Sequence, residues 1–410
     1  MQSTIALSAN TQQYIDLEEK YGAHNYHPLP VVLNRGEGVF VWDVDGKRYY
    51  DFLSGYSAVN QGHCHPKIIA ALTEQAQKLT LTSRAFHSSL LGEYEKYITD
   101  YFGYDKVLPM NTGVEAVETA LKLARKWAYE VKGIENNKAM IVVCEGNFHG
   151  RTTGVITFSS DPSAKNNFGP YSPGYTAIPY NDLAALEKSF QDSNVAAFLF
   201  EPIQGEAGVM VPDEGYLTGI RNLCSQYNVL MIADEIQTGL ARTGKMLACD
   251  HENVRPDILV LGKALSGGVL PVSAVLADDE IMMTIKPGEH GSTYGGNPLA
   301  CAVAIAALQV LKEENMVANA AAMGELLRTE IRNLNSPFVE LVRGKGLLNA
   351  IVIKHSNPEA AWDLCLTLKE NGLLAKPTHG DKIRFAPPLL ITQEQVMECV
   401  GIIDRSLQSL

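Results

Sequence analysis

The chain has 410 residues, which is long enough for two or three domains and a large buried core. It carries 34 Lys and Arg residues against 46 Asp and Glu residues, so its net charge is −12. Because a nucleic-acid-binding protein needs a basic surface, this balance argues against a nucleic-acid partner. No uncharged apolar run reaches the roughly 18 residues that span a bilayer, so we expect no membrane-spanning segment.

The N-terminal segment and the cysteines favour a cytoplasmic location. The segment lacks the basic and apolar regions of a signal peptide. It carries Asp16, Glu18 and Glu19 and has no Arg before Arg35, whereas a mitochondrial presequence is rich in Arg and poor in acids. The seven cysteines contain no Cys-x-x-Cys pair, and we therefore expect a reducing compartment.

In chain order, the first predicted element is a hairpin, residues 39–43 and 47–52, about an Asp-Gly turn. Residues 116–128 then place apolar side chains at helical spacing. Short apolar runs that fit strands buried on both faces of a parallel sheet follow at 139–144, 196–200, 229–233 and 258–261. Helical stretches such as 182–189 and 216–227 separate them. This alternation predicts an α/β fold with a mostly parallel central sheet flanked by helices.

The pattern changes near Leu299, where a long Ala-rich helix leads to helices and separate short strands. We place a smaller α+β domain there. The expected organisation is an N-terminal segment, 1–56, which packs with the small domain, a large domain, 57–305, and the small C-terminal domain, 306–410.

Charged residues follow three of the predicted buried strands. These residues are Glu201, Asp234 and Lys263. A single charge at a strand end marks only where solvent begins. However, ligands of open α/β sheets bind at the carboxyl ends of the strands. An acid and a lysine at neighbouring strand ends therefore predict a functional site.

Two loops that precede helices add to this site. Residues 110–115 contain Gly113, and the free N–H groups at a helix start can hold a phosphate. Residues 288–298 are rich in glycine and hydroxyl groups. Pyridoxal 5′-phosphate needs a lysine for its Schiff base, an acid opposite its pyridinium nitrogen and a phosphate pocket. The set therefore predicts this cofactor.

Two other signals are weaker. Residues 239–245 have the spacing of a nucleotide-binding loop, but Met246 stands where Ser or Thr must bind magnesium. His63, Cys64 and His65 are neighbours that we interpret as a turn before a helix, and we expect no metal site.

Five motifs resemble those of the class III, fold type I pyridoxal-phosphate aminotransferases, and the resemblance extends from about Tyr21 to about Leu390. The motifs are residues 20–26, 57–66, 201–208, 233–239 and 261–268. The resemblance implies a large domain that binds pyridoxal 5′-phosphate and a smaller second domain.

The resemblance also implies roles around the cofactor ring. Lys263 would carry the cofactor as a Schiff base, and Asp234 would pair with the pyridinium nitrogen. Gln237 would hydrogen-bond the ring hydroxyl, while Phe148 and Ile236 would cover the two ring faces.

At the phosphate, the resemblance implies backbone contacts from Gly113 and Val114. Ser292 and Thr293 would reach the phosphate of the neighbouring subunit. The active unit would then be a homodimer with shared active sites.

For the substrate, the resemblance is to the members that use L-ornithine and 2-oxoglutarate. Arg151 would clamp the α-carboxylate of ornithine, while Tyr26 and Tyr56 would line that end of the pocket. Glu206 would pair with Arg384 while ornithine is bound and release it for the second substrate. The expected products are glutamate 5-semialdehyde, which cyclises to pyrroline-5-carboxylate, and glutamate.

Alternatives remain within and outside this family. Related enzymes act on N-acetylornithine, 4-aminobutyrate or lysine, and Tyr26 and Glu206 favour free ornithine over these. An aminomutase on the same fold would need no external oxo acid. A non-catalytic binding protein is disfavoured by the intact Lys263, Asp234 and Arg151.

Overall fold

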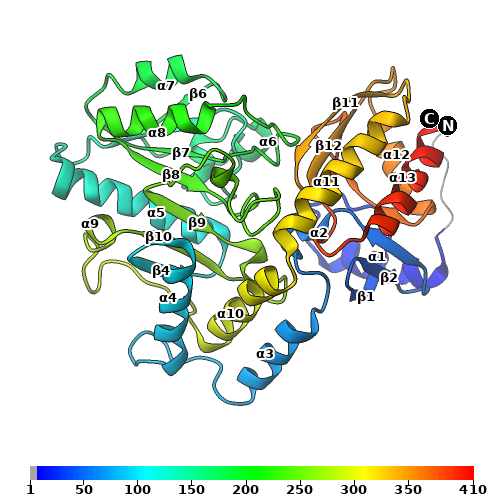
Figure 1. Ribbon diagram of the computed structural model, residues 1–410, viewed down its shortest axis with the longest axis horizontal. Helices are drawn as coiled ribbons and strands as arrows, with labels where there is room; N and C mark the ends of the chain where they lie inside the picture. Colours follow the sequence, from blue (N-terminus) through cyan, green and yellow to red (C-terminus); the bar gives the residue numbers. More distant parts are fainter. Residues whose placement is uncertain (1–6) are drawn as a thin grey trace.

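The computed structural model describes residues 7–410. Its largest sheet has seven strands in the order β4-β10-β9-β8-β7-β5-β6, with helices on both faces (Figure 1). The strands are β4 (Lys106–Met110), β5 (Met140–Cys144), β6 (Tyr175–Ile178), β7 (Val195–Phe200), β8 (Leu230–Asp234), β9 (Ile258–Leu261) and β10 (Ser273–Ala277).

The four apolar runs that predict buried parallel strands are β5, β7, β8 and β9. Together with β6 they pair in parallel. The exceptions are β10, which runs antiparallel to β9, and β4, which pairs antiparallel with β10. The sheet is thus mostly parallel, as the sequence predicts.

Alternate residues of these strands pack on opposite faces of the sheet, as the two-residue period of a strand requires. In β7, Leu199 packs in a core that includes α5 (Gly113–Trp127). Its neighbours Phe198 and Phe200 pack in a second core with α8 (Tyr216–Tyr227). The helix α7 (Leu183–Ser189) packs beside α8. Both faces are covered, which explains why the strands are apolar throughout.

Two smaller sheets lie beside this core, where Figure 1 shows the blue N-terminal elements against the orange and red C-terminal ones. One has the order β11-β12-β15-β14 and the other β1-β2-β3-β13. Their strands are β1 (Leu33–Glu37), β2 (Phe40–Asp43), β3 (Arg48–Asp51), β11 (Val339–Lys345), β12 (Leu348–Ile353), β13 (Leu373–Leu374), β14 (Lys376–Thr378) and β15 (Lys382–Phe385). The predicted hairpin is β2 with β3, and β3 also pairs in parallel with β13.

The remaining helices connect and cover these sheets. They are α1 (Ala9–Tyr21), α2 (Ser54–Ser57), α3 (Pro66–Ala76), α4 (Ser89–Phe102), α6 (Pro162–Lys165), α9 (Asp279–Met282), α10 (Pro298–Glu313), α11 (Met316–Asn333), α12 (Ala360–Glu370) and α13 (Gln393–Leu407). Short helical turns occur at Ala128–Lys132, Val155–Phe158, Ala248–His251 and Lys263–Ser266. Within residues 7–410, no helix combines the length and apolar character needed to cross a membrane.

The domain limits at 56 and 305 stay predictions. The second limit falls inside α10, which continues unbroken to Glu313 and packs against α3 and α4. The pairing of β3 with β13 places the N-terminal segment in a sheet with C-terminal residues.

Candidate active site

Lys263 follows β9 and begins a short helical turn. Its backbone φ is +44°, in the left-handed region that a residue with a Cβ rarely occupies. Such a conformation costs energy and persists only where the surrounding structure imposes it, as at functional sites. Burial lowers the pKa of the Lys263 ammonium group, although Asp234 and Glu206 oppose this effect. A lowered pKa favours the uncharged amine, which is the nucleophilic form.

Asp234 ends β8 and is 5% exposed. Its Oδ2 lies 2.7 Å from Nδ1 of His149, and its Oδ1 accepts from the N–H of Ile236 at 3.1 Å. Burial alone would lower the pKa of His149, but the bond to Asp234 outweighs it and the pKa is raised. The Asp234 carboxylate is therefore held in a fixed orientation between His149 and the backbone of Ile236.

Glu201 follows β7 at the same sheet edge. Its Oε2 accepts from the N–H of Phe148 at 3.0 Å. Burial raises the pKa of the Glu201 carboxyl to about 8, so it holds a proton at neutral pH. The two acids at neighbouring strand ends thus have different partners, a backbone N–H for Glu201 and the His149 ring for Asp234.

The helix α5 begins with a capping box made by Thr112 and Glu115. The Glu115 carboxylate accepts from the N–H groups of Asn111 at 3.1 Å and Thr112 at 2.8 Å. Within residues 7–410, this arrangement leaves the N–H groups of Gly113 and Val114 without a protein acceptor. Two free N–H groups at a helix start suit a phosphate.

Gly113 also packs closely against Ile236. A Cβ at position 113 would lie 3.1 Å from Ile236 Cδ1. We call the free N–H groups of Gly113 and Val114 the phosphate cradle. Because Ile236 is predicted to cover one face of the cofactor ring, the phosphate cradle lies next to the side chain predicted for that role.

Five of the predicted residues line one cavity of about 560 Å³. They are Tyr56, Phe148, Arg151, Glu206 and Arg384. The Arg151 side chain is more than half exposed and lies only loosely against Asp161, 3.9 Å away. Its guanidinium carbon is 5.5 Å from the Phe148 ring centroid. Arg151 is thus available for an anionic group that enters the cavity.

Arg384 is 2% exposed and is held differently. Its Nη1 donates to Glu206 Oε1 at 2.7 Å, and its guanidinium carbon lies 5.0 Å from the Tyr56 ring centroid. Burial opposes ionisation of Glu206, but Arg384 outweighs it and the pKa of Glu206 is lowered. The two side chains therefore form a charged pair, which we call the gate pair.

Gln237 bonds to both members of the gate pair. Its Nε2 donates to Glu206 Oε1 at 3.0 Å, and its Oε1 accepts from Arg384 Nη1 at 3.2 Å. A Cβ at Gly205 would lie 1.6 Å from Gln237 Oε1, so a larger residue at this position would displace the Gln237 amide from these contacts. The sequence assigns Gln237 to the ring hydroxyl alone and gives no sign of these contacts.

The remaining predicted residues do not line this cavity. Tyr26 is 73% exposed. Burial is the main cause of the raised pKa of Tyr56, and Tyr26 is close enough to add to it. Ser292 Oγ accepts from Asn111 Nδ2 at 2.8 Å, beside the phosphate cradle, and Thr293 is exposed. His149 is the residue that sequence reasoning missed, although it stands between Phe148 and Arg151.

His63 and His65 do not converge on one point. His63 bonds to Asp51 at 2.7 Å and His65 to Glu314 at 3.1 Å. They join chain segments, in keeping with the predicted turn before α3.

Residues 21–407 match the family described as aminotransferase class-III. The chain is 65% identical over 400 residues to "Ornithine aminotransferase, mitochondrial" of Rattus norvegicus, covering 97% of this chain and 91% of the relative. It is 56% identical over 415 residues to "Ornithine aminotransferase" of Emericella nidulans, covering 98% and 91%.

Solved structures show the same similarity. The ornithine aminotransferase from Toxoplasma gondii ME49 has a TM-score of 0.96 at 49% identity, covering 98% of this chain and 96% of that one. A structure described as acetylornithine aminotransferase from Elizabethkingia anophelis has a TM-score of 0.91 at 61% identity, covering 98% and 100%.

Proposed function

The chain belongs to the class III aminotransferases, and we propose that it transfers the δ-amino group of L-ornithine to 2-oxoglutarate. The products are glutamate and glutamate 5-semialdehyde, which cyclises to pyrroline-5-carboxylate. The observation that carries this proposal is one cavity with two unlike arginines, since Arg151 is exposed and Arg384 is covered by Glu206.

The residues present fit pyridoxal 5′-phosphate. Gly113 and Val114 offer N–H groups to the phosphate, Asp234 offers a fixed carboxylate to the pyridinium nitrogen, and Lys263 offers an amine of lowered pKa. When bound, the cofactor supplies the electron sink that accepts an amino group from one substrate and returns it to the next. The Lys263 amine would then be the base that moves the proton at the carbon that carries the amino group.

Arg151 and the gate pair select the two substrates in turn. Arg151 binds the α-carboxylate of ornithine, which places the distal amine at Lys263. Glu206 keeps Arg384 neutralised at this stage, so the cavity accepts an uncharged carbon chain. 2-Oxoglutarate has two carboxylates, and the second binds Arg384 once Glu206 releases it.

A homodimer with shared active sites is part of the proposal. Thr293 is exposed and Ser292 is half-buried. Two large aromatic side chains are also exposed, Tyr294 at 58% and Phe86 at 74%. Exposed aromatic side chains of this size favour burial against a second subunit. Sedimentation of the purified protein tests this, and a monomer at micromolar concentration would contradict it.

The cytoplasmic location stays a prediction as well. Its support is the sequence composition described above, whereas the rat relative carries "mitochondrial" in its name. Subcellular fractionation of the native source, with detection of this chain, decides between the two compartments.

The test of the reaction is the absorption spectrum of the cofactor-loaded protein. L-Ornithine without an oxo acid should remove the band of the bound cofactor, and 2-oxoglutarate should restore it. A response to N-acetylornithine or 4-aminobutyrate, with none to ornithine, would overturn the substrate assignment. An aminomutase would turn over without an oxo acid.

Tyr26→Phe is a second test that distinguishes ornithine from 4-aminobutyrate as the substrate, because Tyr26 is assigned to the α-amino group of ornithine. The substitution should reduce the use of ornithine far more than that of 4-aminobutyrate, which has no α-amino group. An equal loss with both substrates would remove this role from Tyr26.

A further inference from the structure

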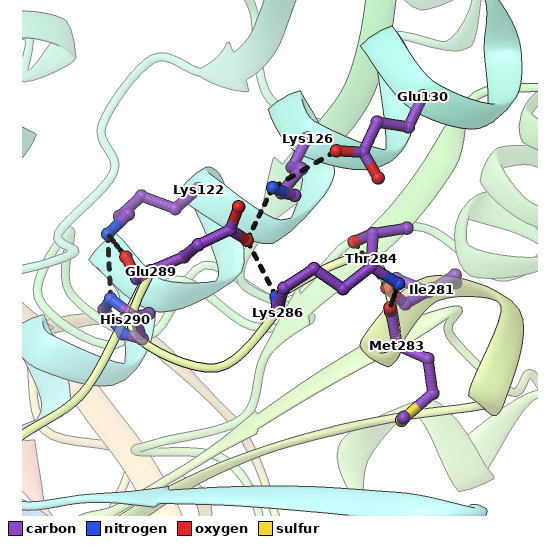
Figure 2. Close-up of polar contacts among 9 residues, drawn as sticks. All are labelled: Lys122, Lys126, Glu130, Ile281, Met283, Thr284, Lys286, Glu289 and His290. Carbon is purple, nitrogen blue, oxygen red and sulfur yellow. Dashed lines mark hydrogen bonds and ion pairs between the residues drawn. The ribbon is translucent and has the colours of Figure 1, made fainter.

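The loop between α9 and α10, residues 283–297, is tied to one face of α5 (Figure 2). Lys126 Nζ lies 2.5 Å from Glu289 Oε2, which also accepts from the N–H of Lys286 at 2.7 Å. Lys122 Nζ donates to the carbonyl oxygen of Glu289 at 3.3 Å. At the base of the loop, Thr284 Oγ1 donates to the carbonyl of Ile281 at 2.8 Å.

His290 has the most specific contacts of this loop. Lys122 Nζ lies 2.9 Å from its Nδ1, and Thr119 Oγ1 lies 2.8 Å from its Nε2. An ammonium group only donates, so Nδ1 accepts and Nε2 carries the proton, which it donates to Thr119. Burial and the charge of Lys122 lower the pKa of His290, in agreement with a neutral ring.

The same contacts lead to the start of α5. Thr119 is fully buried, and its hydroxyl donates to the carbonyl of Glu115 at 2.7 Å. Glu115 is the capping-box residue of the phosphate cradle. The ring of His290 is therefore fixed relative to the helix start by a chain of two hydrogen bonds, and it is two residues away from Ser292.

Ser292 is held so that its hydroxyl hydrogen stays free. Its Oγ accepts from Asn111 Nδ2 at 2.8 Å and from the N–H of Gly295 at 3.1 Å. An oxygen that accepts twice directs its own hydrogen away from both donors. The group left to receive that hydrogen must be an acceptor, and a phosphate oxygen is one.

We propose that His290 is a positioning residue, which Thr119 and Lys122 hold so that Ser292 and Thr293 present their hydroxyls to the cofactor phosphate of the partner subunit. This inference rests on the proposed function, which supplies the shared phosphate site. It makes α5 the common support of two phosphate contacts, one at its own N-terminus and one through the loop.

The test compares pyridoxal 5′-phosphate with pyridoxal, which lacks the phosphate. Both are titrated spectroscopically into the full-length protein after its cofactor is removed. His290→Ala should weaken binding of the phosphorylated ligand about tenfold and leave pyridoxal unchanged, because a charge-assisted hydrogen bond is lost. Thr119→Val should do the same, and Thr119→Ser should restore wild-type binding. Lys96→Ala, at an exposed pair on α4, is the matched control and should change neither titration.

Ser292→Ala separates this inference from the proposed function. If Ser292→Ala and His290→Ala both weaken only the phosphorylated ligand, their combined effect should be smaller than the product of the two, since they act on one contact. If Ser292→Ala weakens binding and His290→Ala does not, or if His290→Ala weakens both ligands equally, the positioning role is overturned. If the wild type binds pyridoxal as tightly as pyridoxal 5′-phosphate, the result contradicts the shared phosphate site of the proposed function instead.

Discussion

Arg384 and Glu206 form an ion pair whose Nη1 and Oε1 atoms lie 2.7 Å apart, and Arg384 is 2% exposed. Arg384 Nε is buried and has no hydrogen-bond partner among residues 7–410. The guanidinium is therefore incompletely satisfied by protein groups. A second carboxylate would complete its bonding, and under the proposed function the dicarboxylic substrate would supply that carboxylate.

Glu206→Gln should change the preference between the two amino donors. The amide keeps the shape of the side chain but leaves the positive charge of Arg384 uncompensated. The rate of the half-reaction with L-glutamate, relative to L-ornithine, should rise roughly tenfold. Stopped-flow absorption with each amino acid measures this ratio. The exposed Glu74→Gln is the control, and an unchanged ratio would remove the gate role from Glu206.

Arg151→Lys tests the carboxylate clamp. Lysine keeps the charge but loses the paired N–H groups that bind a carboxylate at two points. The KM for ornithine should rise about 10- to 100-fold, with a smaller change in kcat. Steady-state kinetics with ornithine checks this, with Arg35→Lys at an exposed pair as the control. A loss confined to kcat would mean that Arg151 acts on the reaction and not on binding.

Arg242 is fully buried and joins distant parts of the chain. It donates to Asn60 Oδ1 at 2.6 and 3.1 Å and, through Nη1, to the carbonyls of Leu347 at 2.9 Å and Pro387 at 2.7 Å. Burial lowers its pKa to about 9. Arg242→Ala leaves these buried acceptors unpaired and should reduce the free energy of unfolding by about 3–5 kcal/mol.

Denaturant unfolding measures this loss, and the exposed Arg405→Ala is the control. Arg242→Lys should recover part of the stability, because lysine still donates. A loss below about 1 kcal/mol for Arg242→Ala would show that water replaces the guanidinium.

Glu201→Gln should change how stability depends on pH. The pKa of the Glu201 carboxyl is about 8 in the folded protein, against an ordinary value of 4.5. Between these values the native state holds a proton that the unfolded chain has released, so stability falls as pH rises. Glutamine has no such proton and can still accept from Phe148. The variant should therefore gain roughly 2–4 kcal/mol on the wild type between pH 5 and 8.

Thermal unfolding of the cofactor-free protein across this pH range checks the prediction. The exposed Glu214→Gln should follow the wild type at every pH. Parallel curves for wild type and Glu201→Gln would mean that Glu201 is ionised in the folded state.

The sequence predicts the elements whose signals are local. Residues 258–261 are a short apolar run, and such a run predicts a buried strand by itself. Asp234 and Lys263 stand out because each lies at the end of a predicted strand. The direction of β10 could not be predicted, because a buried run looks the same in parallel and antiparallel pairs. The two-residue strand β13 has no pattern of its own and exists through its pairing with β3.

The resemblance implies the pairing of Glu206 with Arg384, which the structure shows, but other contacts between distant residues were missed. Gln237 and Arg384 are 147 positions apart, and Lys122 and His290 are 168 apart. No periodicity or motif in the amino-acid sequence connects either pair. The chemical roles of these residues stay predictions from the sequence, and the fold shows which of the side chains contact one another.

The pairing of β3 with β13 can form only after the ribosome has synthesised nearly the whole chain. Lys47 donates across this junction to the carbonyl of Glu370, 323 positions later. At about 5–20 residues per second, a ribosome needs roughly 15–65 s to deliver the second strand after the first. During that time the edge of β3 has no partner from its own chain, and an unpaired edge is a template for association. Unfinished or C-terminally truncated chains should therefore aggregate through their N-terminal hairpin.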